Sequence, residues 1–136
     1  RATWQAVARM YNEEAAKYSA TMATGFALLS IDRENGSPST TLGPKMGMEA
    51  TSLTRTLKSM EERGLITRKK NPTDGRGVII QLTKEGKEKR ELSKETVLRF
   101  NETVKQHISE EKLQHFMEVA EIINELITDK KIYNDK

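Results

Sequence analysis

The stretch that decides the fold runs from residue 65 to residue 82 and reads LITRKKNPTDGRGVIIQL. A basic segment at its start and an apolar segment at its end flank a glycine-rich run that contains Arg76. Gly75 and Gly77 can adopt the positive φ angles that close antiparallel strands. The pattern predicts a β-hairpin that holds Arg76 out from the protein body, where it could enter the narrow minor groove of DNA. Taken alone, it also fits a charged surface turn.

A helix with one apolar and one polar face is predicted within residues 48–64, just before the hairpin. Leu53, Leu57 and Met60 recur at helical spacing, and Gly64 occupies the position of a helix C-cap. The opposite face carries hydroxyl and basic side chains that can reach phosphates and base edges in the major groove. These side chains belong to Thr51, Ser52, Thr54, Arg55 and Lys58. Polar helix faces are usually only solvated, so the neighbouring segments decide between the two interpretations.

A shorter helix that ends at Gly47 is predicted upstream, so two short helices follow each other across a tight connection. Helix, turn, helix, basic strand, wing and return strand then occur in one uninterrupted order from residue 39 to residue 82. This order is more specific than any of its parts. Gly43 and Pro44 lie inside the first helix, where proline removes a backbone donor and should limit the length of the helix.

These features together resemble the MarR (multiple antibiotic resistance regulator) family of winged helix-turn-helix transcription regulators. The resemblance extends over essentially the whole chain. It rests on the run Thr54-Arg55…Leu57…Met60-Glu61…Gly64-Leu65-Ile66…Arg68, on the wing signature Asp74-x-Arg76-Gly77, on the following Gln81-Leu82-Thr83-x-x-Gly86, and on long helices at both ends. The fold it implies is mainly α with a small antiparallel β-hairpin.

The resemblance implies specific roles for the wing. Arg76 would enter the minor groove, and Asp74 would brace the wing through a salt bridge. Gly75 stands where family members often have a second arginine, so this wing should depend more heavily on Arg76. The full set of residues expected to contact DNA is Thr51, Ser52, Thr54, Arg55, Lys58, Arg68, Lys69, Lys70 and Arg76.

Both ends of the chain carry apolar helical stripes. One contains Trp4, Val7, Ala8, Tyr11, Ala15 and Tyr18, and the other contains Leu113, Phe116, Met117, Ala120, Ile123 and Ile127. Thr83 is a predicted N-cap for a helix over residues 84–108, and Ser109 for the last helix. The stripes could form an intramolecular core, but Val119, Ile122 and Leu126 broaden the second one, which favours a subunit interface.

The resemblance supports the second alternative and implies a homodimer on a palindromic operator. Residues 1–18 and 84–136 would form the helical dimerisation region of a single MarR-like chain, and residues 19–83 the winged helix-turn-helix lobe. It also implies a small lipophilic or aromatic effector bound between these lobes. The candidates for its pocket are Tyr11, Tyr18, Met22, Phe26 and Met46. Such residues at helical spacing more often belong to a core.

The charge distribution favours DNA as the partner. The net charge is only +3, but residues 45–84 hold nine Lys or Arg against four Asp or Glu, a local excess of +5. A DNA reader needs this phosphate neutralisation, whereas the alternative, a winged-helix module that binds protein without direct DNA binding, does not. With no cysteine, the sequence offers no disulfide, no thiolate metal site and no cysteine-oxidation sensor.

No catalytic residue, cofactor or metal site is expected, because the sequence has no phosphate-binding loop and no nucleophile with a nearby base. His107, Glu111 and His115 share a four-residue spacing, but Ser109 should break the helix between the first two. No run is long and apolar enough to span a membrane, and no signal peptide is visible. A cytoplasmic protein is therefore expected.

Overall fold

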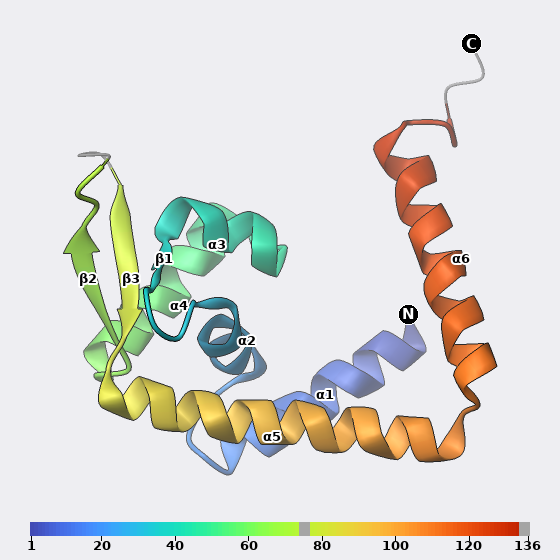
Figure 1. The fold of residues 1–136 in the computed structure, drawn as a ribbon, viewed down its shortest axis with the longest axis horizontal. Helices are drawn as coiled ribbons and strands as arrows, with labels where there is room; N and C mark the ends of the chain where they lie inside the picture. The colour runs from blue at the N-terminus through green and yellow to red at the C-terminus, as the bar shows by residue number, and fades with distance from the viewer. Residues whose placement is uncertain (74–76, 134–136) are drawn as a thin grey trace. The chain divides into compact units, whose positions relative to one another are not determined.

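The computed structural model describes residues 1–73 and 77–133 (Figure 1). It forms two compact units, Arg1–Val97 and Leu98–Lys136. In chain order the helices and strands are α1 (Ala2–Ala16), α2 (Met22–Ser30), β1 (Ser37–Pro38), α3 (Ser39–Met46), α4 (Ala50–Glu62), β2 (Ile66–Lys70), β3 (Val78–Leu82), α5 (Lys84–His107) and α6 (Glu110–Thr128). The mainly helical class with a small antiparallel sheet is as the sequence predicts.

The sheet has three strands in the order β1-β3-β2, and all pairs are antiparallel. β2 and β3 form the predicted hairpin, with Ile66 opposite Leu82 and Arg68 opposite Ile80. The third strand, β1, was not predicted, because two residues that include a proline carry no strand pattern. Pro38 is tolerated there since β1 lies at the edge of the sheet.

The chain enters β1 through Gly36, where only glycine fits. Its φ is +73°, and a Cβ atom at this position would lie 2.5 Å from the carbonyl oxygen of Ile80. Ser37 then pairs with Ile80 across the ladder. This close approach holds the segment that leads directly into α3 against β3.

The core lies between α2, α3, α4 and the sheet. Leu28, Ile31, Leu42, Met60, Ile66 and Ile80 are its largest fully buried side chains. The predicted apolar face of α4 is confirmed, because Leu53, Leu57 and Met60 are all buried. Burial of this face leaves the opposite face of α4 at the surface.

The helix-turn-helix follows the predicted order. α3 runs for eight residues through Pro44 and ends at Gly47, whose φ of +64° is left-handed. The Met48 amide donates to the Gly43 carbonyl at 3.0 Å, which closes the tight connection to α4. Proline therefore does not interrupt this helix, although it removes one backbone donor.

Side-chain caps fix where three helices begin. Thr83 Oγ1 accepts from the Gly86 amide at 3.0 Å before α5, and Ser109 Oγ accepts from the Lys112 amide at 3.2 Å before α6. Both predicted caps are confirmed. Thr21 caps α2 in the same way, through the Thr24 amide at 3.2 Å. The break at Ser109 places His107 and His115 on different helices.

Candidate nucleic-acid interface and adjoining cavity

The exposed face of α4 carries the polar side chains that the sequence singles out. Thr51, Ser52, Thr54, Arg55 and Lys58 are all exposed, and they alternate with the buried positions that anchor the helix. Thr54 Oγ1 donates to the Ala50 carbonyl at 2.8 Å, so the hydroxyl proton is used within the helix. Its oxygen can still accept a hydrogen bond from a base amino group.

Strand β2 adds a row of basic side chains beside α4. Ile66 is buried, and the four residues that follow it, Thr67, Arg68, Lys69 and Lys70, are exposed. β2 is an edge strand and contacts α4 (Figure 1). The basic edge and the polar helix face therefore belong to one compact unit.

Arg68 has a second role that the sequence pattern does not reveal. Its Nε lies 3.3 Å from Glu61 Oε2 at the end of α4. Both side chains are more than one-third exposed, so this ion pair contributes little to stability. The pair joins β2 to the end of α4, and it partly neutralises the charge that Arg68 can offer to a phosphate.

The base of the wing is ordered by its own hydrogen bonds. The Asn71 amide donates to the Gly77 carbonyl at 3.1 Å, which extends the ladder by one step. Asn71 Oδ1 accepts from the Thr73 amide at 3.0 Å, an arrangement typical of turns that begin with asparagine. Asp74, Gly75 and Arg76 lie outside the described residues, so the roles expected of the wing tip remain predictions.

A cavity of about 360 Å³ lies in the Arg1–Val97 unit. Four of the five residues predicted for a ligand pocket line it: Tyr11, Tyr18, Met22 and Phe26. Met46 does not line it and packs against the buried core instead. Helical spacing could not distinguish a cavity residue from a core residue. It shows which residues share a face of a helix, but not what that face packs against.

Much of the cavity wall was missed by sequence reasoning. α5 contributes Lys89, Leu92, Ser93, Thr96 and Val97, and the turn after α4 contributes Arg63 and Leu65. Arg63 and Lys89 bring positive charge to the wall, and the described lining includes no carboxylate. The wall is otherwise mostly apolar, with a few hydroxyl groups.

Two tyrosines of the wall differ in their surroundings, since one is partly buried and the other lies near a cation. Burial raises the pKa of the Tyr11 hydroxyl above its ordinary value of 10.0. Lys89 Nζ lies 5.9 Å from the centroid of the Tyr18 ring, within the range of a cation–π contact. The cavity thus combines apolar surface with a cation near an aromatic ring.

Residues 20–78 match the MarR family, and this range contains α4, β2 and most of the cavity wall that precedes α5. The chain carries a MarR-family domain. It is similar to the uncharacterized HTH-type transcriptional regulator YdgJ of Bacillus subtilis (strain 168), with 31% identity over 78 residues. That alignment spans 57% of this chain and 48% of YdgJ.

A second relative of the MarR-family domain is the organic hydroperoxide resistance transcriptional regulator of the same Bacillus strain. It is 44% identical over 45 residues, which are 33% of this chain and 31% of that regulator. The chain therefore aligns with less than half the length of either curated relative.

Solved structures show the same fold over nearly the whole chain. MarR family transcription regulator SP03579 matches with a TM-score of 0.85 at 17% identity. The match covers 98% of this chain and 89% of the SP03579 chain. PcaV from Streptomyces coelicolor, in complex with its natural ligand, matches with a TM-score of 0.78 at 20% identity. This match covers 92% of this chain and 88% of the PcaV chain. The predicted winged helix-turn-helix class is confirmed.

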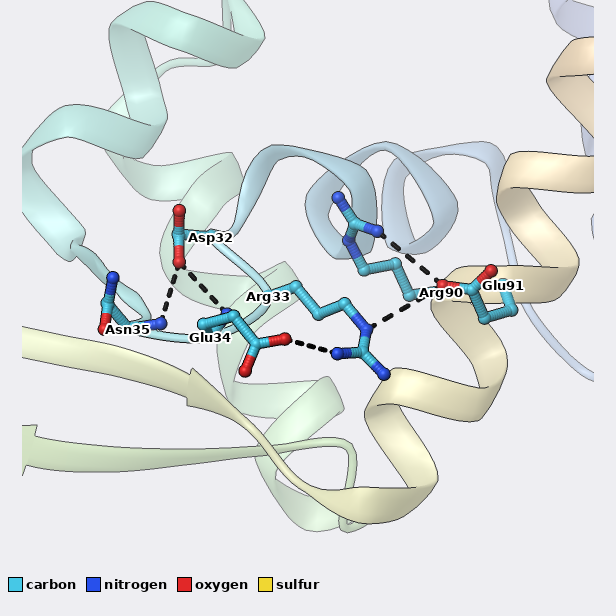
Figure 2. A network of polar contacts seen from close by, with 6 residues as sticks. All are labelled: Asp32, Arg33, Glu34, Asn35, Arg90 and Glu91. Carbon is cyan, nitrogen blue, oxygen red and sulfur yellow. Dashed lines mark hydrogen bonds and ion pairs between the residues drawn. The ribbon is translucent and has the colours of Figure 1, made fainter.

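The loop before β1 of the MarR-family domain is held by Asp32 (Figure 2). Its Oδ1 accepts from the Asn35 amide at 2.7 Å and from the Glu34 amide at 3.0 Å. These hydrogen bonds, with that from Asn35 the larger effect, lower the pKa of the Asp32 carboxyl below its ordinary value of 3.8. The carboxylate form therefore orders the loop at neutral pH.

Arg33 links the same loop to α5. Its guanidinium pairs with Glu34, and its Nε lies 3.9 Å from Glu91 Oε1 (Figure 2). Arg90 Nη1 lies at the same distance from that carboxylate oxygen. α5 is thus joined by ion pairs to the loop that leads into the helix-turn-helix.

Neither a metal centre nor a membrane span is found in the described part of the domain and its flanking helices. Among residues 1–73 and 77–133, no three His, Cys, Asp or Glu residues lie close enough to hold a metal ion. None of the helices described there is both long and apolar enough to cross a bilayer.

Proposed function

We propose that this chain is a DNA-binding transcription regulator that acts as a homodimer on a palindromic operator and blocks or alters transcription nearby. The observation that carries the proposal is the exposed polar and basic face of α4 beside the basic edge strand β2. A helix of this kind fits the major groove of DNA, and a pair of strands beside it can reach the neighbouring sugar-phosphate backbone. The MarR-family domain supports this assignment. Such a regulator would act in the cytoplasm.

The residues expected to contact DNA fall into two groups, those that can reach base edges and those that can reach only the DNA backbone. Thr51, Ser52, Thr54 and Arg55 lie in the first half of α4 and would face base edges or adjacent phosphates. Lys58, Lys69 and Lys70 would hold the backbone by charge. Arg68 would contact phosphate only in part, because Glu61 shares its charge.

Recovery of preferred DNA from a random pool tests the function. The full chain is incubated with random duplexes, and bound DNA is amplified and sequenced over several rounds. We expect enrichment of an inverted repeat whose half-sites lie about one helical turn apart. Failure to enrich any sequence, with the protein folded, would support a winged-helix module that binds protein instead.

Replacement of Arg76 by alanine tests the predicted wing contact. If Arg76 enters the minor groove, the change should cost about 1 to 3 kcal/mol of binding free energy per wing. Titration of the enriched duplex by fluorescence anisotropy measures the loss. Lys94→Ala removes the same charge from an exposed position of α5 and should have a much smaller effect. Equal affinities for Arg76→Ala and the wild type would mean that the wing tip is an ordinary surface turn.

The dimer is supported by the apolar surface of α6. None of its 19 residues is buried in a single chain. Its exposed large apolar side chains are Phe116, Met117, Val119, Ile122, Ile123, Leu126 and Ile127. A contiguous apolar face of this kind is typical of a subunit interface.

Light scattering at micromolar concentration should report twice the chain mass of 15.4 kDa. Ile123→Glu places a charge on the apolar face and should shift the protein toward monomer, with weaker binding to a palindrome. Asn124→Glu adds the same charge at the neighbouring exposed polar position and should remain dimeric. A wild-type protein that is monomeric throughout would contradict the dimer.

We also propose that the cavity holds a small lipophilic or aromatic effector. Its mostly apolar wall and its volume of about 360 Å³ support this assignment. Two proteins of similar fold are known with ligands: PcaV with its natural ligand, and CouR from Rhodococcus jostii RHA1 with p-coumaroyl-CoA. CouR has a TM-score of 0.76 at 20% identity and covers 89% of this chain and 85% of its own.

A further inference from the structure

The turn that joins α4 to β2, residues 63–65, contacts both the candidate interface and the cavity. Arg63 is the C-cap of α4, and Arg63 and Leu65 both line the cavity. The Gly64 φ of +73° turns the chain sharply between them. Any displacement of this turn therefore moves the end of α4.

One side of the turn is fixed by the start of α5. Thr83 Oγ1 donates to the Gly64 carbonyl at 2.6 Å, and the Thr83 amide donates to the Leu65 carbonyl at 3.0 Å. Gly86 is buried against the same segment, since a Cβ atom on it would lie 2.0 Å from the Leu65 carbonyl oxygen. These two hydrogen bonds and the close approach of Gly86 hold the turn against the start of α5.

The other side of the turn reaches the wall of the cavity through one exposed side chain. Arg63 Nη2 donates to the carbonyl of Ser19, a residue 44 positions earlier in the connection between α1 and α2. Ser19 has a φ of +56°, a left-handed conformation that serine rarely adopts. Tyr18, Ala20 and Thr21, the residues around it, line the cavity.

We propose that Arg63 is a positioning residue that couples residues 18–21 of the cavity wall to the C-terminal end of α4. The proposal rests on the DNA-binding function proposed above. A ligand that moves residues 18–21 displaces Arg63, and α4 tilts about the point where Thr83 and Gly86 hold residues 64 and 65. Coupling between two sites is reciprocal, so DNA that holds α4 must also restrict residues 18–21. This consequence can be measured without knowing the effector.

Hydrogen exchange of the full chain, with and without the duplex enriched from the random pool, tests the coupling. In the wild type, DNA should slow exchange of the Ser19, Ala20 and Met22 amides by about fivefold, near the lower end of typical allosteric coupling. In Arg63→Met this DNA-dependent slowing should be lost, while the α4 amides remain protected by DNA. Lys94→Met removes a charge from an exposed position of α5, away from the turn, and should behave as the wild type.

Arg63→Lys keeps the positive charge and an N–H donor, so DNA should still slow exchange of these amides in part. If Arg63 had a purely structural role, Arg63→Met would speed exchange of these amides equally with and without DNA. The ratio of the exchange rates without and with DNA would then equal that of the wild type. An unchanged ratio in Arg63→Met, with α4 still protected, overturns the coupling alone. No protection of α4 by DNA in the wild type would contradict the proposed function as well.

Discussion

Replacement of Gly86 by alanine should lower the free energy of unfolding by about 3 kcal/mol or more, as expected for a severe steric clash in a packed site. A Cβ atom would lie 2.0 Å from the Leu65 carbonyl oxygen, and that oxygen is backbone. It cannot move aside cheaply, because it accepts from the Thr83 amide at 3.0 Å. Urea unfolding followed by far-UV circular dichroism measures the effect.

The sign of this change is informative, because alanine at an interior helix position usually stabilises by about 1 kcal/mol relative to glycine. Gly25→Ala in α2 is the matched control. A Cβ atom there would meet Ser93 Oγ at 3.3 Å, a side-chain contact that is tight but far from the clash at Gly86. We expect Gly25→Ala to stay within about 1 kcal/mol of the wild type. Comparable stability of the two variants would mean that α5 does not approach the turn as closely as described.

DNA binding should weaken steeply with salt. If each subunit of the dimer neutralises about four phosphates, log K falls with log salt at a slope near −7, at about 0.9 per phosphate. Between 50 and 200 mM salt this slope corresponds to a loss of about 10⁴-fold in affinity. Anisotropy titrations of the enriched duplex over this salt range give the slope directly.

The slope also shows which side chains neutralise phosphates. Lys69→Gln and Lys70→Gln should each reduce its magnitude by about 0.9 for every phosphate that the variant no longer neutralises. Lys94→Gln, at an exposed position of α5, removes equal charge and should leave the slope nearly unchanged. A wild-type slope close to zero is incompatible with a DNA-binding surface made of α4 and β2.

Local patterns predicted the elements of the domain well. Leu53, Leu57 and Met60 share one face at helical spacing, and all three are buried. Thr83 and Ser109 begin helices because a hydroxyl can satisfy a free amide in the first turn. Such signals lie within a few residues of one another, so they can be read along the chain.

Contacts between distant segments could not be read in this way. Ser37 pairs with Ile80, and Arg63 reaches Ser19, across 43 and 44 positions respectively. Arg68 was predicted as a DNA contact from its charge, yet its pairing with Glu61 depends on how β2 crosses the end of α4. Met46 has the same residue type as Met22 but faces the core.

The sequence by itself determined the order of helix, turn, helix, strand, wing and strand from residue 39 to residue 82. It also determined the apolar face of α4, the two capped helix starts and the basic character of residues 45–84. Each depends on periodicity, turn chemistry or charge, which act over one or two helical turns. Only the tertiary structure decided that α5 and residues 63–65 complete the cavity, and that Gly86 admits no side chain. The reason is that packing brings backbones together at distances that no local pattern encodes.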